Sequence, residues 1–279
     1  MNSSPATPVD LHTLRARRVQ LLKIPFAAIS FSETLELLIE LAKGSHPAYV
    51  VTANVDHVVR YHRRPELRQL YTEADLVVAD GMPVIWASRL LGQPLPERVA
   101  GSDLFPALCA QAAKNDLAVF LLGGAPGTAR QAAKVLQTEH PRLRVAGIFC
   151  PDYGFEDDPS QMSRVIEVVR AAQPDILFVG LGSPKQENWI AANRQACGAK
   201  LSIGVGISFS FVSGHVTRAP RWMRWIGLEW FHRLCQEPRR LWRRYLIDDS
   251  IFLLLVVKGL WERGVVSRGS GVGAERFRV

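Results

Sequence analysis

Short runs of branched apolar residues alternate with longer amphipathic stretches through the first two hundred residues of the chain. Runs of this kind are typical of buried strands, and the amphipathic stretches are typical of helices. The predicted strands span residues 18–24, 49–52, 76–79, 118–122, 143–148, 176–180 and 200–205, and the predicted helices include 32–43, 103–115, 128–139, 160–173 and 184–197. This alternation predicts an α/β fold in which helices cover both faces of a mostly parallel sheet.

The starts of three predicted helices carry recognisable residues. Ser32 followed by Glu33 indicates a helix start, and Pro126 and Pro184 suit a first helical turn, where proline's missing N–H costs nothing. Rossmann-like sheets of this kind bind ligands at the carboxyl ends of their strands. The residues that directly follow each strand are therefore the candidates for a site.

The alternation stops after Val205. Residues 206–220 are expected to form a loop, and the sequence beyond them is helix-prone, aromatic and basic. We therefore expect two units: an α/β domain over 1–214, with a boundary near Gly214, and a helical C-terminal appendage over 215–279. The last dozen residues, rich in Gly, Ser and Arg, are expected to form a frayed tail.

The charge of the chain is concentrated at its C-terminal end. Residues 215–279 contain 13 Lys and Arg against 6 Asp and Glu, so they carry +7 of the net charge of +8. A nearly neutral body followed by a basic, aromatic segment indicates that this segment meets an anionic partner.

Composition excludes several classes of protein. Hydrophobic residues make up 48% and charged residues 22%, which is globular rather than disordered or fibrous. The four cysteines are 41, 47 and 38 residues apart without a CxxC pair, which argues against a disulfide scaffold or a zinc site. The N-terminus has no apolar stretch that could form a signal-peptide core, so a cytoplasmic location is expected.

Polar residues follow two of the predicted strands. Thr52 and Asn54 could bind sugar hydroxyls or a phosphate, although they could equally cap a helix. Asp80 follows the next strand, where a carboxylate is well placed to act as a general base, and a turn Asp before Gly81 is the alternative.

Two glycine-containing junctions connect later strands to helices. Gly123 and Gly124 could allow close approach of a phosphate to a helix N-terminus, but Leu122 stands where a dinucleotide fingerprint needs glycine, and no Walker motif is present. NAD and ATP are therefore poorly supported. The second junction follows another strand with more polar residues, which favours a nucleotide-facing role over plain capping. Its candidates are Gly182, Lys185, Gln186 and Glu187.

The C-terminal arginines are interleaved with tryptophans, unlike a lysine-rich solubility surface. Arginine holds phosphate oxygens in two-point contacts, and tryptophan favours a membrane interface. The apolar run 251–257 is far shorter than the roughly 20 residues that span a bilayer, so it could lie on a membrane without crossing it. The arginines concerned are Arg218, Arg221, Arg224, Arg233, Arg239, Arg240, Arg243 and Arg244.

Metal and covalent chemistry are weakly indicated. The acidic run 156–158 precedes a predicted helix, where acids also act as caps, and the sequence contains neither GxSxG nor HExxH. His57 and His62 fit a helix surface as well as a catalytic role. We therefore expect neither a metal nor a cofactor.

Taken together, these segments resemble the WecG/TagA/CpsF family of glycosyltransferases over residues 20–245. The matching stretches are Thr52-x-Asn54, Ala79-Asp80-Gly81, Arg98-Val99-x-Gly101-Ser102-Asp103-Leu104, Gly123-Gly124-x-x-Gly127, Gly182-x-Pro184-Lys185-Gln186-Glu187-x-Trp189, Arg218-Ala219-Pro220, Gly227-Leu228-Glu229-Trp230 and Glu237-Pro238-x-Arg240. The resemblance implies inverting transfer of a sugar from a UDP-sugar to a polyprenyl-diphosphate-linked saccharide, in cell-surface or exopolysaccharide assembly at the inner face of the membrane.

The resemblance also implies roles for individual residues. Asp80 becomes the base, Thr52 and Asn54 position sugar or acceptor, and Gln186 with its neighbours lines the nucleotide pocket. The appendage would close over the diphosphate and meet the membrane. Two departures from the family pattern, Pro83 and Ser210, bear on the donor sugar.

No convincing pair of carboxylates is available to hold a divalent cation, whereas arginines are plentiful. We therefore expect metal-independent catalysis with Arg218, Arg221 and Arg224 as the leading phosphate clamp, and Arg98 and Asp103 near the substrate. A homo-oligomer is possible. One alternative is a nucleic-acid-binding protein that uses the basic tail, but such a protein would not need the polar strand tips. The other is an NAD-dependent oxidoreductase, which the broken glycine fingerprint disfavours.

Overall fold

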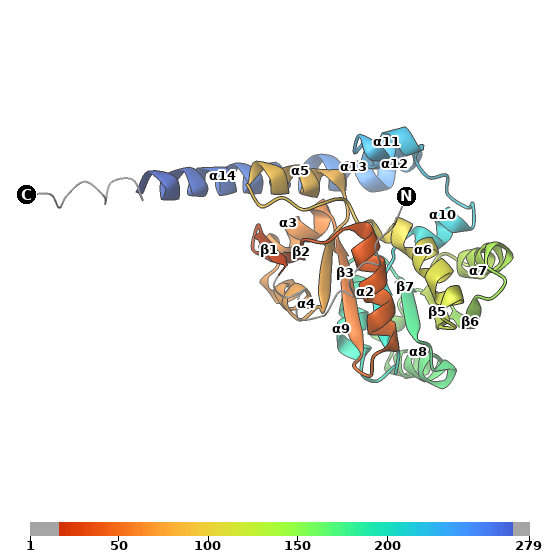
Figure 1. Ribbon diagram of the computed structural model, residues 1–279. Coiled ribbons are helices and arrows are strands. Elements are labelled where there is room, and N and C mark those ends of the chain that lie inside the picture. The colour runs from red at the N-terminus through yellow and green to blue at the C-terminus, as the bar shows by residue number, and fades with distance from the viewer. Residues whose placement is uncertain (1–16, 270–279) are drawn as a thin grey trace, which may run out of the picture.

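The computed structural model describes residues 17–269, and a parallel six-stranded sheet forms its centre (Figure 1). The sheet order is β4-β3-β8-β7-β5-β6. The strands are β3 (Ala48–Ala53), β4 (Leu76–Ala79), β5 (Ala118–Gly123), β6 (Arg144–Phe149), β7 (Ile176–Gly180) and β8 (Leu201–Gly204). The predicted α/β class with a parallel sheet is confirmed.

Helices cover both faces of this sheet, because alternate residues of each strand are buried on opposite sides. In β3, Val50 packs in the core cluster of one face, whereas Tyr49 and Val51 pack in that of the other. The first face is covered by α2 (Phe31–Lys43), α6 (Gly101–Lys114), α7 (Thr128–Glu139) and α10 (Ser208–Val212). The second is covered by α3 (Val55–Arg63), α4 (Arg68–Thr72), α5 (Met82–Leu90), α8 (Pro159–Ala172) and α9 (Lys185–Asn193).

Strand β3 lies between β4 and β8, so the chain leaves β3 toward one side of the sheet and returns on the other. The register pairs Ala53 with Ala79 of β4 and Val50 with Ile203 of β8. Such a reversal of the strand order opens a crevice at the carboxyl ends of the strands. The loops after β3, β4 and β8 therefore meet at this crevice.

Several local expectations need correction. The predicted first strand is a separate antiparallel hairpin of β1 (Arg18–Leu21) and β2 (Ile24–Ala27), which turns through positive φ at Leu22 and Lys23. Pro126 and Pro184 precede the helices they were expected to enter. The cap of α2 is Ser30, whose hydroxyl accepts from the Glu33 amide at 3.2 Å, rather than Ser32.

The region expected to be a loop, 206–220, contains the short helix α10. Phe209 of this helix is fully buried and packs edge-on against Phe105 of α6 at 5.1 Å between ring centroids. The apolar residues of this stretch therefore complete the core on one face of the sheet. Its glycines and polar residues had indicated a loop instead.

The C-terminal segment is helical and lies over the carboxyl edge of the sheet (Figure 1). It consists of α11 (Arg221–Trp225), α12 (Glu229–Gln236), α13 (Pro238–Arg243), the π-helical turn η3 (Arg244–Asp248) and α14 (Ile251–Gly269). Within residues 17–269, no helix has the length and apolar content needed to cross a bilayer. The predicted frayed tail lies almost entirely outside the described residues.

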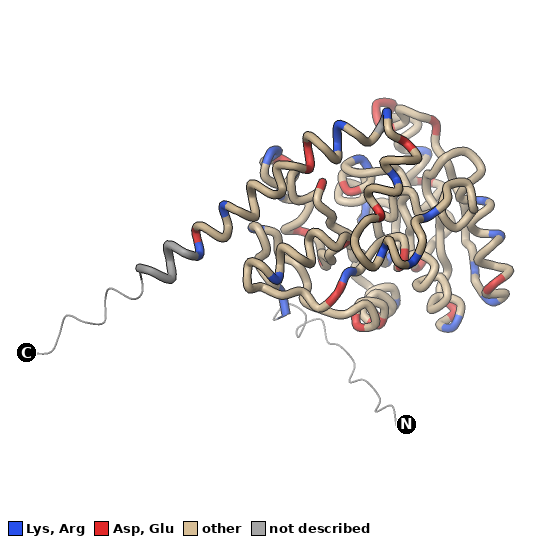
Figure 2. Tube along the Cα trace, turned by 90° about the horizontal axis from the view of Figure 1, so that it is seen from above, with Lys and Arg blue, Asp and Glu red and all other residues tan. Residues whose placement is uncertain are grey.

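Helix α14 begins by packing on the body and then extends beyond it (Figure 1). Phe252 and Val256 are buried and belong to the same core cluster as α3 and α5. Up to Arg263 its only charged residues are Lys258, Glu262 and Arg263, so much of it is tan in Figure 2. The two units expected on either side of Gly214 thus share a core, and their independence stays a prediction.

Candidate functional site

A cleft of about 750 Å³ lies at the carboxyl ends of β3, β4, β7 and β8, beneath the C-terminal segment. Its floor includes Thr52, Asn54 and Asp80 from the strand tips, as well as Gly182 and Gln186 from the junction between β7 and α9. Side chains of α11, α12, η3 and α14 line the opposite side. The structure therefore brings the predicted strand-tip residues together in one cavity.

Asp80 directly follows β4, where its amide donates to the Ala53 carbonyl at 2.9 Å. Its Oδ2 accepts a hydrogen bond from the Gly101 amide at 3.2 Å. Burial raises the pKa of the Asp80 carboxyl to about 6, with Arg98 opposing the rise and Glu229 adding to it. A carboxylate with a pKa near neutrality is suited to accept a proton.

Thr52 and Asn54 both line the cleft. Thr52 is mostly buried, and its hydroxyl donates to the Gly204 carbonyl at 3.4 Å. Asn54 caps α3, since its Oδ1 accepts from the amide of His57 at 3.3 Å. The capping alternative is therefore correct for Asn54, but it does not remove this side chain from the cavity.

Gly101 lies against Thr52 at the start of α6. A Cβ at this position would come within 3.1 Å of the Thr52 hydroxyl. The lack of a side chain lets the start of α6 approach Thr52 closely, and the Gly101 amide there donates to Asp80.

Glu187 and His57 form a buried pair at the cleft, which His57 lines, and each is only 3% exposed. His57 Nε2 lies 3.3 Å from Glu187 Oε1, and its Nδ1 lies 2.9 Å from Oδ1 of Asn54. Although burial opposes ionisation, the hydrogen bond from His57 holds the pKa of the Glu187 carboxyl below its ordinary value. The surface alternative for His57 is wrong: this ring connects a buried carboxylate to a cleft-lining amide.

Gln186 connects the same pair to the tip of β8. Its Nε2 donates to Glu187 Oε1 at 2.7 Å, and its Oε1 accepts from the Gly206 amide at 3.0 Å. Gln186 lines the cleft, whereas Glu187 faces His57. Lys185 instead pairs with Glu156, and its Nζ lies 4.7 Å from the centre of the Tyr153 ring. The three neighbours thus have three different environments, and Gln186 lines the cavity together with Gly182 and Ser183 of this junction.

Arginines and carboxylates form a network at the rim of the cleft. Asp103 in the first turn of α6 accepts from Arg98, Arg218 and Arg224 at 2.7, 2.7 and 3.2 Å. Glu229 accepts from Arg98 at 3.2 Å and from Arg218 at 3.0 Å. Burial raises the pKa of Asp103, but the arginines outweigh it and hold the pKa below its ordinary value.

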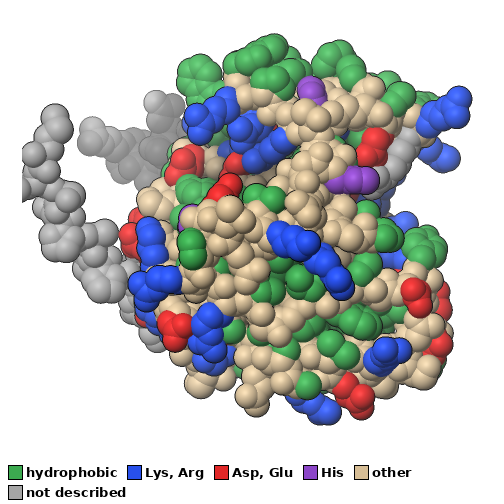
Figure 3. Space-filling view, turned by 90° about the vertical axis from the view of Figure 1, so that its right-hand side faces the viewer, with side chains coloured by type: hydrophobic (Ala, Val, Ile, Leu, Met, Phe, Trp, Pro, Cys, Tyr) green, Lys and Arg blue, Asp and Glu red, His purple; other side chains and the backbone are tan. Residues whose placement is uncertain are grey.

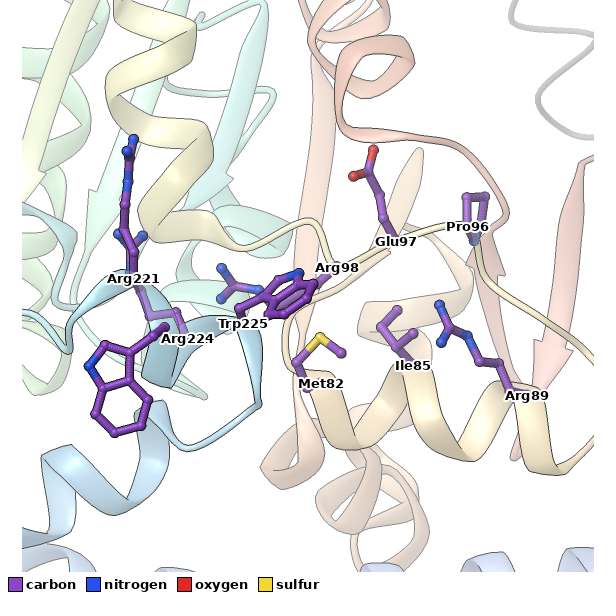
Figure 4. A pocket seen from close by; sticks show the side chains of 10 residues that line it. Met82, Ile85, Arg89, Pro96, Glu97, Arg98, Arg221, Arg224 and Trp225 are labelled. Carbon is purple, nitrogen blue, oxygen red and sulfur yellow. The ribbon is translucent and has the colours of Figure 1, made fainter.

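The three predicted clamp arginines differ in position. Arg218 is engaged on Asp103, Glu229 and Ser102, the last through a 2.7 Å hydrogen bond to the hydroxyl, and does not line the cleft. Arg224 does line it, as does Arg98. Arg221 instead lines a neighbouring cavity of about 620 Å³ between α11 and α5 (Figure 4).

The predicted phosphate-binding glycines are used for packing. A Cβ on Gly123 would lie 3.0 Å from the Gly180 carbonyl oxygen, and one on Gly124 would lie 2.9 Å from the Phe209 ring. Both have positive φ and neither is among the residues that line the cleft. Close packing against the end of β7 explains Gly123, and close packing against α10 explains Gly124.

The acidic run before α8 caps this helix, which was the alternative to a cation site. Asp158 Oδ1 accepts from the Ser160 amide at 2.8 Å. Among residues 17–269, no three His, Cys, Asp or Glu side chains are grouped so that they could hold a metal ion.

Comparison with known proteins identifies the chain's family. The family model for WecG/TagA/CpsF glycosyl transferases matches residues 19–265. The chain belongs to this family. It is 34% identical to the N-acetylglucosaminyldiphosphoundecaprenol N-acetyl-beta-D-mannosaminyltransferase of Bacillus spizizenii over 199 residues, covering 71% of this chain and 75% of the relative. Identity to the enzyme of the same name from Staphylococcus aureus is 30% over 243 residues, covering 85% and 92%.

The two residues expected to depart from the family pattern lie in different places. Pro83 lines the cleft near Asp80 in the first turn of α5. Ser210 is 6% exposed in α10 and is not among the cleft-lining residues. Pro83 is therefore the departure that can touch a ligand directly.

A second polar cluster faces the cleft and was not predicted from the sequence. Asp56 lies 2.9 Å from Arg60 and 3.1 Å from Arg244, and Asp249 lines the cavity nearby. Burial, with Asp56 beside it, raises the pKa of the Asp249 carboxyl to about 7. Arg244 belongs to the basic C-terminal arginines of the sequence, but no sequence pattern indicated that it would contact Asp56.

Proposed function

We propose that this protein transfers a sugar from a UDP-sugar donor to a polyprenyl-diphosphate-linked saccharide, with inversion at the anomeric carbon. Membership of the glycosyltransferase family and the names of the relatives support this class of reaction. N-acetylmannosamine is the first donor sugar to test, because the relatives' names specify it. The observation that carries the proposal is the position of the Asp80 carboxyl, which lies in a cleft bordered by arginines. Its pKa of about 6 suits a general base.

The reaction requires one displacement. The acceptor hydroxyl attacks the anomeric carbon, its proton passes to Asp80, and the bond from that carbon to the β-phosphate oxygen breaks, so that UDP leaves with the electron pair. One displacement inverts the configuration. Thr52 and Asn54, which line the same floor, are suited to bind sugar hydroxyls.

Arginines are proposed to stabilise the departing UDP without a divalent cation. Arg98 and Arg224 line the cleft and can offer N–H groups to phosphate oxygens. Arg218 holds Asp103 and Glu229 in place beside them, which makes it a positioning residue rather than a direct clamp. Gln186 is proposed to contact the nucleotide side of the cavity.

The C-terminal segment is proposed to rest on the inner face of the cell membrane, where a lipid-linked acceptor would be found. Tryptophans are exposed there: Trp222 is 61%, Trp225 83% and Trp242 49% exposed. Figure 3 shows hydrophobic side chains gathered along the upper edge of the molecule beside basic ones. Aromatic and cationic side chains together favour an anionic membrane surface.

The decisive experiment is a transfer assay. Purified full-length protein is incubated with a panel of UDP-sugars and a synthetic saccharide linked to polyprenyl diphosphate, and the product is identified by mass spectrometry and its anomeric configuration by NMR. We expect transfer with inversion and thermal stabilisation by UDP. Absence of transfer, combined with a salt-dependent mobility shift on nucleic acid and no stabilisation by UDP, would instead favour the nucleic-acid-binding alternative.

A further inference from the structure

The cleft that contains Asp80 has an apolar arm. Met82, Trp86 and Leu90 of α5 line it, and they lie four residues apart, on one face of the helix. Phe252, Leu253 and Val256 of α14 line it as well. The polar floor thus continues into a groove between two apolar helix faces.

Large side chains in this groove are open to solvent. Trp86 is 43%, Leu90 63% and Leu253 67% exposed, and Leu246 of η3 is 58% exposed. Single exposed apolar residues are ordinary, but a contiguous set along a cavity is typical of a binding surface. Something apolar that also reaches the polar floor would complete this cleft.

The groove starts at the candidate base. Asp80 and Gly81 directly precede α5, and Leu90 is eight residues beyond Met82, which is about 12 Å along a helix. Arg244 lines the same cavity beside Asp56, and its Nε is buried without a hydrogen-bond partner. The cleft therefore offers a carboxylate and a cation, together with hydrocarbon that extends away from Asp80 along α5.

We propose that the apolar arm, defined by Trp86, Leu90 and Leu253, binds the first isoprene units of the lipid-linked acceptor, with Arg244 beside the acceptor's diphosphate. This inference rests on the proposed function. The acceptor presents its groups in a fixed order: the reacting hydroxyl, the sugar, the diphosphate and the hydrocarbon. A hydroxyl placed at Asp80 directs the hydrocarbon outward, and the arm supplies matching surface in that order.

The occupant could instead be an unconnected lipid chain of the membrane or a second copy of this protein. Neither would require the apolar surface to be continuous with Asp80. Leu254 separates these alternatives, because it is 69% exposed on the same helix as Leu253 but is not among the cleft-lining residues.

The test uses two soluble acceptors that carry the same saccharide diphosphate, one as its farnesyl ester and one as its methyl ester, without vesicles or detergent. We expect the wild-type KM to be at least about 10-fold lower for the farnesyl acceptor, as burial of several apolar groups predicts. Leu90→Ser and Leu253→Ser should each raise the farnesyl KM by about 5- to 10-fold and leave the methyl KM unchanged. Leu254→Ser should change neither.

Each outcome separates the two proposals. Equal KM values for both acceptors in the wild type overturn this inference and leave the proposed function intact. Equal effects of Leu253→Ser and Leu254→Ser overturn it as well, because they indicate a general surface effect. Failure to transfer to either acceptor contradicts the proposed function, and this inference falls with it.

Discussion

Nη1 of Arg218 lies 2.7 Å from Oδ1 of Asp103, so the start of the C-terminal segment is held against the first turn of α6 across 115 residues of sequence. Both side chains are largely buried, at 18% and 27% exposed. The ion pair therefore fixes the segment that covers the cleft. The pairs Arg224–Asp103 and Arg98–Glu229 and the buried residues of α14 hold the same segment.

Replacing Arg218 by Met should lower the free energy of unfolding by about 1–3 kcal/mol, since Asp103 and Glu229 lose one partner while Arg98 remains. Urea unfolding measures this. Arg221→Met is the matched control, because Arg221 is exposed on α11, and it should unfold close to the wild-type midpoint. Equal midpoints for the two variants would show that the Arg218 network adds no stability.

Asp80→Asn should reduce kcat by about 100- to 10,000-fold, because the amide cannot take the acceptor's proton. The affinity for UDP should hardly change, since the base touches the acceptor rather than the nucleotide. Transfer kinetics and UDP titration measure these effects. Asp116→Asn, at an exposed ion pair with Arg144, should keep full activity. A fully active Asp80→Asn enzyme would exclude this residue as the base.

Ionisation of the Asp80 carboxyl should raise the rate of transfer but lower the free energy of unfolding. Its pKa of about 6 lies above the ordinary value near 3.9, so Asp80 holds its proton more tightly in the folded protein than in the unfolded chain. The stability that this proton contributes is present below pH 4 and is lost as the pH rises through 6. The rate should instead fall below pH 6, where the base is occupied.

Asp80→Asn should therefore melt at a higher temperature than the wild type at pH 7.5 and at nearly the same temperature below pH 4. The two-unit shift corresponds to at most about 3 kcal/mol, because one unit is 1.36 kcal/mol. Melting curves at several pH values check this. A stabilisation that does not vary with pH would indicate a cause other than ionisation.

Glu187→Gln should lower kcat by about 10-fold with little change in the KM for UDP-sugar, because a neutral amide holds His57, and through it Asn54, less firmly. Glu187→Asp, which keeps the charge, should recover part of the rate. The control is Glu167→Gln, at an exposed position on α8. Should Glu187→Gln lose only thermal stability and keep its kcat, the pair would be structural alone.

Chelation should leave the rate unchanged, because we assign stabilisation of the leaving UDP to Arg98 and Arg224. The assay compares initial rates with EDTA and with added magnesium or manganese. Arg224→Met should lower kcat by about 100-fold or more, as expected for a lost donor to a developing anion. Abolition by EDTA and restoration by magnesium would overturn the arginine assignment.

Local sequence pattern was sufficient to predict the layers of the fold and the position of Asp80. Buried strands are read from continuous apolar runs, and the residue after a parallel strand lies at the ligand-binding edge by topology alone. Asp80 and Asn54 directly follow their strands as this rule requires, and Thr52 lies within the last two residues of β3. Local pattern predicts one strand over 18–24, where the structure has the hairpin of β1 and β2. The turn of this hairpin contains neither Gly nor Pro, so no local signal marks it.

Tertiary packing alone decided what each side chain meets. Consecutive helical residues point about 100° apart, so a slight rotation of α9 determines that Gln186 lines the cleft, Glu187 contacts His57 and Lys185 lies outside. Likewise, an arginine's charge is visible in the sequence, but its carboxylate partner is not. The sequence specified the backbone through local periodicity, whereas contacts between distant segments determined the chemistry of the cleft.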